Sequence, residues 1–240
     1  MKVFRIIISV VLVIVIGVVA YIGLFTGNAF KYLPAFQKEQ ESEIRGSTVV
    51  FLGSSITNGF GSYNISFADY LTSMYKVNAV KEAVNGTTLV DSDEDSYISR
   101  LKKLDPNMNV QMVVCQISTN DATKNAPLGE VGNMYSIDSF DTSTVAGAIE
   151  YILCYCEDTW SCPVGFYTSF KYDSPEYEQI REILLQIELK WHMPILDLWD
   201  NEEINSHNKS THMIDDIHPT LLCYRDDITP LMYEFIKENT

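Results

Sequence analysis

An apolar run near the N-terminus is long enough to cross a membrane. Residues 6–25 (IIISVVLVIVIGVVAYIGLF) carry no charge, and twenty helical residues span about 30 Å, the thickness of the hydrocarbon core of a bilayer. Lys2 and Arg5 precede the run, and the next basic residue is Lys31. The positive-inside rule therefore predicts a signal anchor over residues 1–26, with a cytoplasmic N-terminus and the remainder of the chain outside the cytoplasm.

A cleavable signal peptide is the alternative reading of the same run. Its apolar region would usually have about 7–15 residues and end in a small-x-small cleavage site. The nearest such pattern is Gly27-Asn28-Ala29. Cleavage there would give a secreted protein, so both readings send the rest of the chain across a membrane.

The charge balance excludes nucleic acid as a partner. The 240 residues contain 17 Lys+Arg and 32 Asp+Glu, a formal net charge of −15, whereas binding to a phosphate backbone needs a clustered basic excess. Without residues 1–26, which hold two basic and no acidic residues, the charge is −17. Such a surface is not attracted to anionic lipids, so we expect residues 6–25 to be the only membrane attachment.

Five cysteines follow the apolar run. They are too few for a disulfide scaffold in a chain of this length, and an odd number leaves at least one thiol unpaired. Buried thiols are the simpler expectation, and a bridge involving Cys162 or Cys223 is the alternative. The five are Cys115, Cys154, Cys156, Cys162 and Cys223.

Beyond a polar connector at residues 27–46, short β-branched runs alternate with amphipathic helices. This alternation predicts that residues 47–240 form an α/β domain, a three-layer α/β/α sandwich with a mostly parallel sheet. The runs at 48–52 and 110–117 are apolar on both faces, as strands covered by helices on both sides must be. The expected strands are residues 48–52, 77–84, 110–117, 163–168 and 194–198.

Three helices show the 3.6-residue period. Ser174 is expected to cap the first, with Pro175 at its first position and an apolar stripe at i, i+3, i+4 and i+7. The other two are expected over residues 144–155 and 221–236. The stripe of the first consists of Ile180, Ile183, Leu184 and Ile187.

Polar residues follow the first three predicted strands, at the sheet edge where ligands of such folds bind. Gly53-Ser54-Ser55 leaves the first strand, and a serine in this turn would expose its hydroxyl, although capping of the next helix explains the same residues. Gly86 follows the second strand and could bring a backbone N–H close to a ligand. Asn120 follows the third and offers a side-chain amide donor.

Asp215-Asp216-Ile217-His218 precedes the last helix and supplies a base. A carboxylate three residues before a histidine can hold its Nδ1–H and leave Nε2 free to accept a proton. These residues would then form one catalytic triad, with Ser55 as nucleophile, His218 as base and Asp215 as the carboxylate that orients His218. The N–H groups of Ser55 and Gly86 and the Asn120 amide would form the oxyanion hole.

These four blocks resemble the GDSL, or SGNH, hydrolase family, whose motifs supply Ser, Gly, Asn and His in this order. The resemblance covers about residue 48 to the C-terminus. It implies a flavodoxin-like parallel sheet of five strands in the order 2-1-3-4-5, esterase or lipase activity on acyl esters, and no metal or organic cofactor.

The chain departs from the family pattern at three places. Ser54 replaces the aspartate of G-D-S, a variant that keeps the nucleophile. Ser118 replaces the glycine of the block that contains Asn120, and the block around Gly86 is abbreviated.

Two patterns in the sequence suggest metal binding, but neither matches a known metal site. The acidic residues 91–95 resemble the start of a calcium loop, but Ser96 and Lys102 occupy the positions where an EF-hand needs Gly and Glu. His207, His212 and His218 have intervals that match no common zinc spacing. We therefore expect no metal site.

The sequence thus predicts a serine esterase that acts outside the cytoplasm on a small-molecule or glycan acyl ester. A short acyl group, for example an O-acetyl group on a carbohydrate, fits because the long segment 124–141 is too polar for a lipid-binding lid. That segment is expected to contribute to the substrate pocket. An O-acyltransferase with the same triad, or a catalytically silent glycan-binding domain, are the alternatives.

Overall fold

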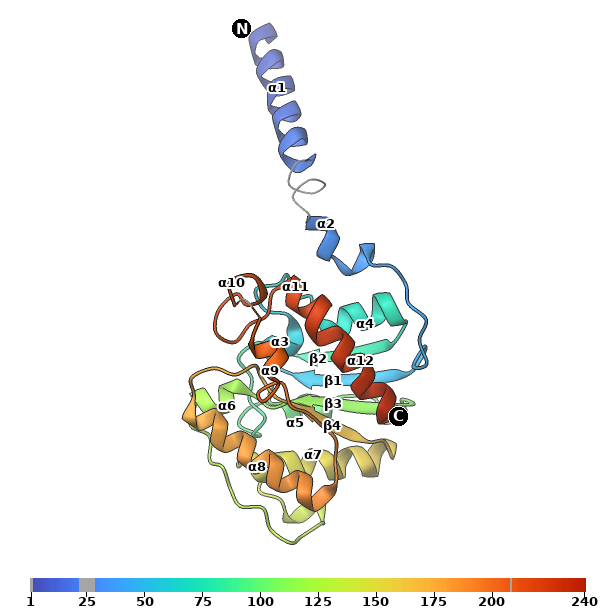
Figure 1. Cartoon of the computed structure of the whole chain (residues 1–240), viewed down its shortest axis with the longest axis vertical. Helices are drawn as coiled ribbons and strands as arrows, with labels where there is room; N and C mark the ends of the chain where they lie inside the picture. Colours follow the sequence, from blue (N-terminus) through green and yellow to red (C-terminus); the bar gives the residue numbers. More distant parts are fainter. Residues whose placement is uncertain (1, 22–28, 208) are drawn as a thin grey trace.

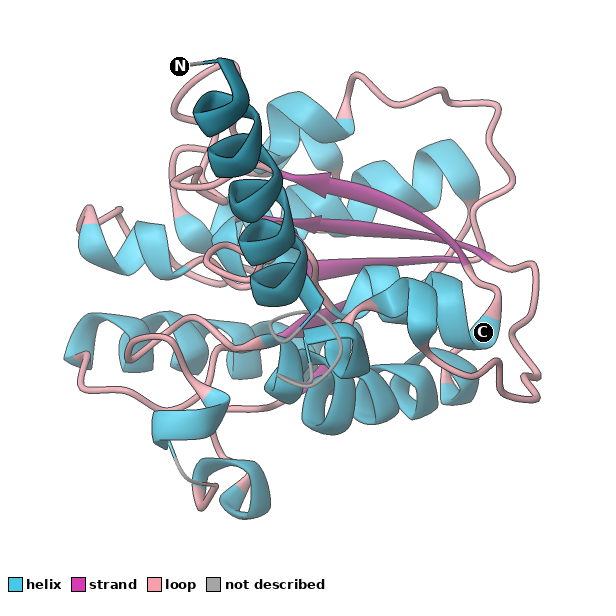
Figure 2. Cartoon of the chain, turned by 90° about the horizontal axis from the view of Figure 1, so that it is seen from above, coloured by secondary structure: helices cyan, strands magenta, loops and turns pink. Residues whose placement is uncertain are grey.

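Five parallel strands form the centre of the protein (Figures 1 and 2), in a computed structural model that describes residues 2–21, 29–207 and 209–240. The strand order is β2-β1-β3-β4-β5, as the family resemblance implies. Each strand was expected from the sequence, and the observed strands are shorter than or nearly equal to the predicted runs. They are β1 (Thr48–Gly53), β2 (Asn78–Ala83), β3 (Met112–Gln116), β4 (Val164–Tyr167) and β5 (Ile195–Leu196).

Helices cover both faces of the sheet. Side chains alternate along a strand, so Val50 and Leu52 of β1 pack toward α5, α7 and α8, whereas Val49 and Phe51 pack toward α4 and α12. The three-layer α/β/α arrangement predicted from the sequence is therefore confirmed. The covering helices are α4 (Phe67–Tyr75), α5 (Tyr97–Leu101), α7 (Val145–Trp160), α8 (Pro175–Trp191) and α12 (Thr229–Glu238).

Short helices lie at the carboxyl edge of the sheet and in the loops that follow β5. Two of them directly follow strands: α3 begins two residues after the end of β1, and α6 begins three residues after the end of β3. Figure 1 shows α3, α6 and α10 at this edge. The set comprises α3 (Ser55–Asn58), α6 (Thr119–Thr123), α9 (Glu202–Asn205), α10 (Lys209–His212) and α11 (Leu221–Cys223). The short helix η3 (Ile137–Ser139) lies before β4 in the chain and packs against α7 instead.

The helix α8 begins as the sequence predicts. The Ser174 hydroxyl accepts a hydrogen bond from the Tyr177 N–H (3.2 Å), and the expected apolar stripe is buried. Thr144 caps α7 in the same way. That helix continues to Trp160, five residues beyond the predicted end. It ends where Ser161 takes a left-handed conformation and donates its N–H to the Glu157 carbonyl.

The C-terminal helix predicted over residues 221–236 is not one continuous α-helix. A π-helical turn at Tyr224–Ile228 separates α11 from α12. Pro230 has no N–H and cannot continue an α-helical hydrogen-bond ladder. The Tyr224 carbonyl accepts from both the N–H and the hydroxyl (2.6 Å) of Thr229. The expectation of a single regular helix was therefore wrong at this turn.

The N-terminal helix α1 (Lys2–Tyr21) is exposed from Phe4 onward. Its window Phe4–Tyr21 has a mean hydropathy of 2.7, so this helix is long and apolar enough to cross a membrane. The rest of the predicted run, residues 22–25, and Gly27-Asn28 of the alternative cleavage pattern lie outside the described residues.

The polar connector contacts the α/β domain. It contains α2 (Ala29–Tyr32) and η2 (Pro34–Phe36). The Arg225 guanidinium donates to the Lys31 carbonyl (2.7 Å) and lies over the Tyr32 ring, and Ile44 is buried in the core next to α4 and α12. The end of the connector is thus packed into the folded domain.

Candidate active site

The turn between β1 and α3 places Ser55 at the carboxyl edge of the sheet. A Cβ on Gly53 would lie 1.8 Å from Thr57 Oγ1, so this turn requires glycine. Gln116, fully buried at the end of β3, accepts hydrogen bonds through Oε1 from the N–H groups of Ser54 (3.0 Å) and Thr57 (3.2 Å). The neighbouring strand therefore fixes the backbone that carries Ser55.

His218 and Asp215 lie on a tight hairpin before α11. The Ile214 N–H donates to the His218 carbonyl (2.7 Å) and closes the hairpin. Asp215 Oδ1 accepts from the N–H groups of Ile217 (2.9 Å) and His218 (2.8 Å), the local turn that aspartate favours. The three-residue spacing seen in the sequence is what this turn needs.

The structure brings Ser55, His218 and Asp215 into one hydrogen-bonded chain. His218 Nδ1 lies 2.8 Å from Asp215 Oδ2, and His218 Nε2 lies 2.9 Å from Ser55 Oγ. A carboxylate accepts only, so Nδ1 carries a proton, and Nε2 of the neutral ring is free to accept the proton of the Ser55 hydroxyl. The Phe60 ring packs 4.8 Å from the imidazole, centroid to centroid, and restricts its rotation.

Asp215 is held in its charged form. Partial burial raises its pKa, but hydrogen bonds from the His218 side chain and from the N–H groups of Ile217 and His218 outweigh this effect, so the pKa lies below its ordinary value. An ionised Asp215 can stabilise a positive charge on the His218 imidazole if that ring accepts a proton.

The three predicted oxyanion donors line one cavity together with Ser55 Oγ and His218. This cavity has a volume of about 210 Å³. Among the described residues, no protein atom accepts a hydrogen bond from the N–H of Ser55 or of Gly86. Gly86 has a φ of +79°, a conformation that favours glycine. One hydrogen of the Asn120 amide donates to the Thr87 carbonyl (3.0 Å), which leaves its second hydrogen for a ligand.

Ser118, which departs from the family pattern, caps helix α6. Its hydroxyl accepts from the N–H groups of Asn120 (3.1 Å) and Asp121 (3.4 Å) and donates to the Thr87 carbonyl (3.3 Å). Serine therefore joins the Asn120 loop to the Gly86 loop instead of separating them.

Asp121 and Arg100 support the site and were not predicted from the sequence. The buried Asp121 carboxylate accepts from the N–H groups of Leu89 (2.7 Å) and Val90 (3.1 Å); burial raises its pKa although these bonds oppose the shift. Arg100 donates to the Gly53 carbonyl (2.8 Å) at the end of β1. A sequence signal that could have identified Arg100 is its position three residues after Tyr97, which places a charged side chain on the buried face of α5.

The segment 124–141, expected to contribute to the substrate pocket, does not line the cavity beside Ser55. Beyond Lys124, which donates to the Gly86 carbonyl (3.1 Å), it packs against α7 and α8. Lys190 of α8 donates to the Met134 carbonyl and lies 4.7 Å from the Tyr135 ring centroid. These contacts draw the segment away from Ser55. The lining of the cavity is Ser55, Phe60, Asn85, Gly86, Thr119, Asn120, Thr123, Ile217 and His218.

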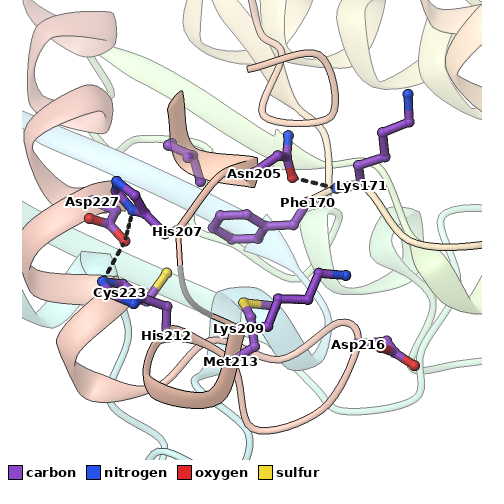
Figure 3. A pocket seen from close by; sticks show the side chains of 11 residues that line it. Phe170, Lys171, Asn205, His207, Lys209, His212, Met213, Asp216, Cys223 and Asp227 are labelled. Atoms are coloured by element: carbon purple, nitrogen blue, oxygen red, sulfur yellow. Dashed lines mark hydrogen bonds and ion pairs between the residues drawn. The ribbon is translucent and has the colours of Figure 1, made fainter. Parts of the chain in front are cut away.

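A second polar cavity lies between α10 and the π-helical turn (Figure 3). Within the described ranges, one group of side chains could hold a metal ion, and it borders this cavity: His207, His212 and Asp227. The sequence did not indicate it because Asp227 comes fifteen residues after His212, in a different structural segment.

Comparison with known proteins agrees with the fold. The model of the GDSL-like lipase/acylhydrolase family matches residues 51–225, whereas none of the curated protein sequences matches the chain.

Solved structures with the same fold have low sequence identity. A protein from Lactobacillus plantarum is 16% identical, with a TM-score of 0.63 over 82% of this chain and 97% of that one. A protein described as lipolytic and of the G-D-S-L family, from Desulfitobacterium hafniense, is 16% identical, with a TM-score of 0.60 over 79% and 99%. An acetylxylan esterase from Geobacillus stearothermophilus is 15% identical, with a TM-score of 0.58 over 81% and 96%.

Proposed function

The chain belongs to the GDSL-like lipase/acylhydrolase family and is an ester-hydrolysing enzyme, and we propose that Ser55, His218 and Asp215 are its catalytic triad. The observation that carries this proposal is the continuous chain of contacts from Ser55 Oγ through the imidazole to Asp215, with distances of 2.9 and 2.8 Å. A serine hydroxyl is a weak nucleophile and needs such a base.

In the proposed acylation step, His218 Nε2 accepts the Ser55 proton while Oγ attacks the ester carbonyl carbon. The carbonyl oxygen becomes an oxyanion, which the N–H groups of Ser55 and Gly86 and the Asn120 amide stabilise. The intermediate then collapses, the C–O bond to the alcohol breaks, and His218 gives its proton to the departing alkoxide. The acyl group remains on Ser55 as an ester.

Deacylation repeats these steps with water. His218 accepts a proton from water, the hydroxide attacks the acyl carbon, and the second oxyanion occupies the same donors. Cleavage of the acyl–Oγ bond releases the carboxylic acid and returns the proton from His218 to Ser55. No group beyond the triad and the oxyanion donors is needed to balance the reaction.

The cavity favours a short acyl group on a polar alcohol. Its volume of about 210 Å³ is below the range of about 300–1,000 Å³ typical of sites for drug-sized ligands. Several lining side chains are polar, among them Thr119, Asn120 and Thr123. An acetyl ester of a carbohydrate fits this chemistry, and the fold shared with an acetylxylan esterase is consistent with it.

The proposed location is outside the cytoplasm. Residues 1–26 would form the membrane anchor, residues 27–46 the connector, and residues 47–240 the catalytic domain. The exposed apolar helix α1, with Lys2 and Arg5 before the apolar run, supports an anchor with a cytoplasmic N-terminus. A membrane attachment with a domain of net charge −17 would rely on this helix alone.

Hydrolysis of p-nitrophenyl acetate by the full chain in detergent tests the nucleophile. Ser55→Ala is expected to lose at least 10³-fold in kcat/KM. Ser54→Ala is the matched control, because the Ser54 hydroxyl accepts from Gln116 Nε2 (3.2 Å) inside the turn and does not line the cavity. Equal loss in the two variants, or a fluorophosphonate label on a residue other than Ser55, would refute the assignment.

Two further experiments test the length of the acyl group and the acceptor that it is transferred to. With p-nitrophenyl acetate and octanoate, a short-chain site predicts a higher kcat/KM for acetate. With a sugar acceptor present, hydrolysis predicts acetate as the product, whereas acetylated sugar would support the transferase alternative. An inactive wild-type chain that still binds glycans would support the silent-domain alternative.

A further inference from the structure

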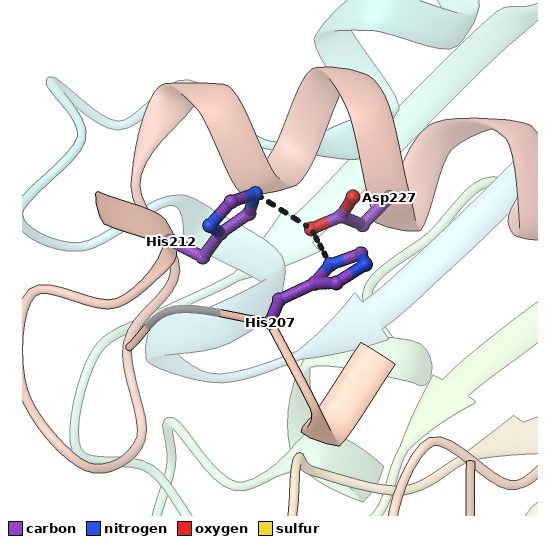
Figure 4. Close-up of side chains that lie close together, drawn as sticks. All are labelled: His207, His212 and Asp227. Atoms are coloured by element: carbon purple, nitrogen blue, oxygen red, sulfur yellow. Dashed lines mark ion pairs between the residues drawn. The ribbon is translucent and has the colours of Figure 1, made fainter. Parts of the chain in front are cut away.

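His207, His212 and Asp227 converge on one point at the edge of the second cavity (Figure 4). Asp227 Oδ2 lies 3.2 Å from His207 Nδ1 and 3.6 Å from His212 Nε2. The Asp227 side chain is only 8% exposed. Yet Asp227 Oδ2 and His207 Nδ1 are both buried atoms without a hydrogen-bond partner among the residues that the structure describes. A buried carboxylate oxygen left in this state is costly unless another group binds it.

The distances between these three atoms fit ligand atoms that bind one common metal ion. In tetrahedral zinc sites the bonds to His nitrogen and carboxylate oxygen are about 2.0–2.2 Å, so two ligand atoms lie about 3.3–3.5 Å apart. The two measured distances lie on either side of this range, and the three ligand atoms are all within 4.8 Å of one another. Short distances without hydrogen-bond geometry are expected when each atom points toward a common centre.

The cavity next to these side chains has room for one water molecule or ion. Its volume of about 20 Å³ is enough for one water molecule. Lys171 and Lys209 also line it, but Figure 3 shows their ammonium groups directed away from the three candidate ligands. Cys223 also borders the cavity, but the side chains whose ligand atoms converge are those of His207, His212 and Asp227.

We propose that His207, His212 and Asp227 bind one Zn²⁺ ion, with a water molecule as its fourth ligand. Two imidazoles and a carboxylate are zinc donors, and three protein ligands with one open position form a known zinc arrangement. The cavity is too small for dioxygen and an organic co-substrate, which the iron sites with similar donors need. The site is separate from the triad and its cavity.

The proposed ion would connect two segments: the hairpin that contains His218, and the C-terminal helical segment that contains Asp227. His212 stands at the base of that hairpin, where its carbonyl accepts from the Thr220 N–H (2.9 Å) and hydroxyl (3.1 Å). His218 and Asp215 lie between these two residues. Asp227 belongs to the buried π-helical turn, so a metal bond between His212 and Asp227 would restrict the hairpin base.

Zinc binding can be measured on the full chain in detergent, after treatment with a chelator and its removal. We expect one Zn²⁺ per chain by calorimetry and elemental analysis. At free Zn²⁺ a hundred times above Kd, the Tm is expected to rise by about 5–10 °C. Mg²⁺ at the same concentration is expected to leave the Tm unchanged, because it prefers oxygen ligands.

Matched substitutions identify the ligands. Asp227→Asn is expected to abolish the Zn²⁺-dependent rise in Tm, and Asp226→Asn, one residue earlier and exposed, to keep it. His207→Asn is expected to weaken binding at least tenfold, whereas His192→Asn, at the end of α8, is expected to bind as the wild type does. If Asp227→Asn does not fold, the His207→Asn comparison decides. No Zn²⁺ binding to the wild type, or equal loss in targets and controls, would overturn the proposal.

Hydrogen exchange tests the link to the hairpin without relying on activity. Zn²⁺ is expected to slow exchange of the amides of residues 213–220 and to leave those of α7 unchanged. Unaltered exchange at 213–220 with zinc bound would refute the fastening role. Ser55→Ala is expected to bind Zn²⁺ like the wild type, so a failure of the proposed catalytic mechanism would not affect this result.

Discussion

Replacement of Gln116 by Met should damage both the stability and the catalytic turn. Methionine keeps nearly the same volume but cannot accept the hydrogen bonds from the N–H groups of Ser54 and Thr57. Each buried N–H left without a partner costs about 1–3 kcal/mol. The Gln116→Met variant should therefore lose about 2–6 kcal/mol of unfolding free energy. The Thr57 hydroxyl also donates to Gln116 Oε1 (2.7 Å). Only one of the Thr57 and Tyr167 hydroxyls can donate to the other across their 2.6 Å contact, so the second loses its acceptor and adds to the loss.

Urea unfolding and steady-state hydrolysis of p-nitrophenyl acetate measure the two effects. Without the Gln116 hydrogen bonds, the turn between β1 and α3 is free to move and Ser55 is displaced relative to His218. We therefore expect kcat to fall at least tenfold in molecules that remain folded. Gln111→Met is the matched control: Gln111 Oε1 accepts from the Thr48 N–H at the opposite end of β1, away from Ser55. A change of less than 0.5 kcal/mol in the Gln116 variant, or an equal loss of kcat in both, would refute the reasoning.

Three further predictions concern the same site. Gly53→Ala should lower the unfolding free energy by about 1–3 kcal/mol, because its Cβ would meet Thr57 Oγ1 at 1.8 Å, whereas Gly132→Ala, with no atom within 4 Å, should change it by less than about 0.5 kcal/mol in urea unfolding. Asn120→Ala should lower kcat for p-nitrophenyl acetate about 10²–10³-fold with little change in KM, and an unchanged kcat would exclude this amide from the oxyanion hole. Burial raises the pKa of Asp215 and hydrogen bonds lower it more, so the net shift is downward from about 3.8; a lowered folded-state pKa gives stability that is present at neutral pH and lost as the pH falls through that pKa. The Tm difference between wild type and Asp215→Asn should therefore shrink between pH 7 and pH 3, and a difference that grows in acid would contradict this sign.

The sheet could be predicted from the sequence because its central strands are short apolar runs with turn residues at their ends, although the edge strand β2 (NAVKEA) is mixed in polarity. The runs at 48–52 and 110–117 became β1 and β3, and the polar residues after them reached one edge of the sheet. Local patterns also identified the hairpin at 215–218, since the aspartate and the histidine are only three residues apart.

Residues that act across the fold could not be predicted in this way. Gln116 and Arg100 reach backbone atoms more than 40 residues away in the chain, and no local spacing indicates such contacts. The segment 124–141 had the length and polarity of a substrate loop, but cation–π and carbonyl contacts of Lys190 decide where it packs. The His207–Asp227 contact likewise depends on the π-helical turn, which the apolar pattern of the last helix does not indicate.

The two halves of the proposed triad owe their positions to different kinds of structure. Ser55 is fixed by buried hydrogen bonds from the sheet, chiefly those of Gln116. The hairpin with His218 has its own short hydrogen bonds. Its described contacts with other segments include the one between His218 and Ser55 (2.9 Å) and a bond from the Ser62 hydroxyl to the Pro219 carbonyl (2.9 Å). A surface hairpin with few buried contacts opens more easily than a sheet. Any group that binds His212 to Asp227 would therefore stabilise the half of the triad that the sheet does not reach.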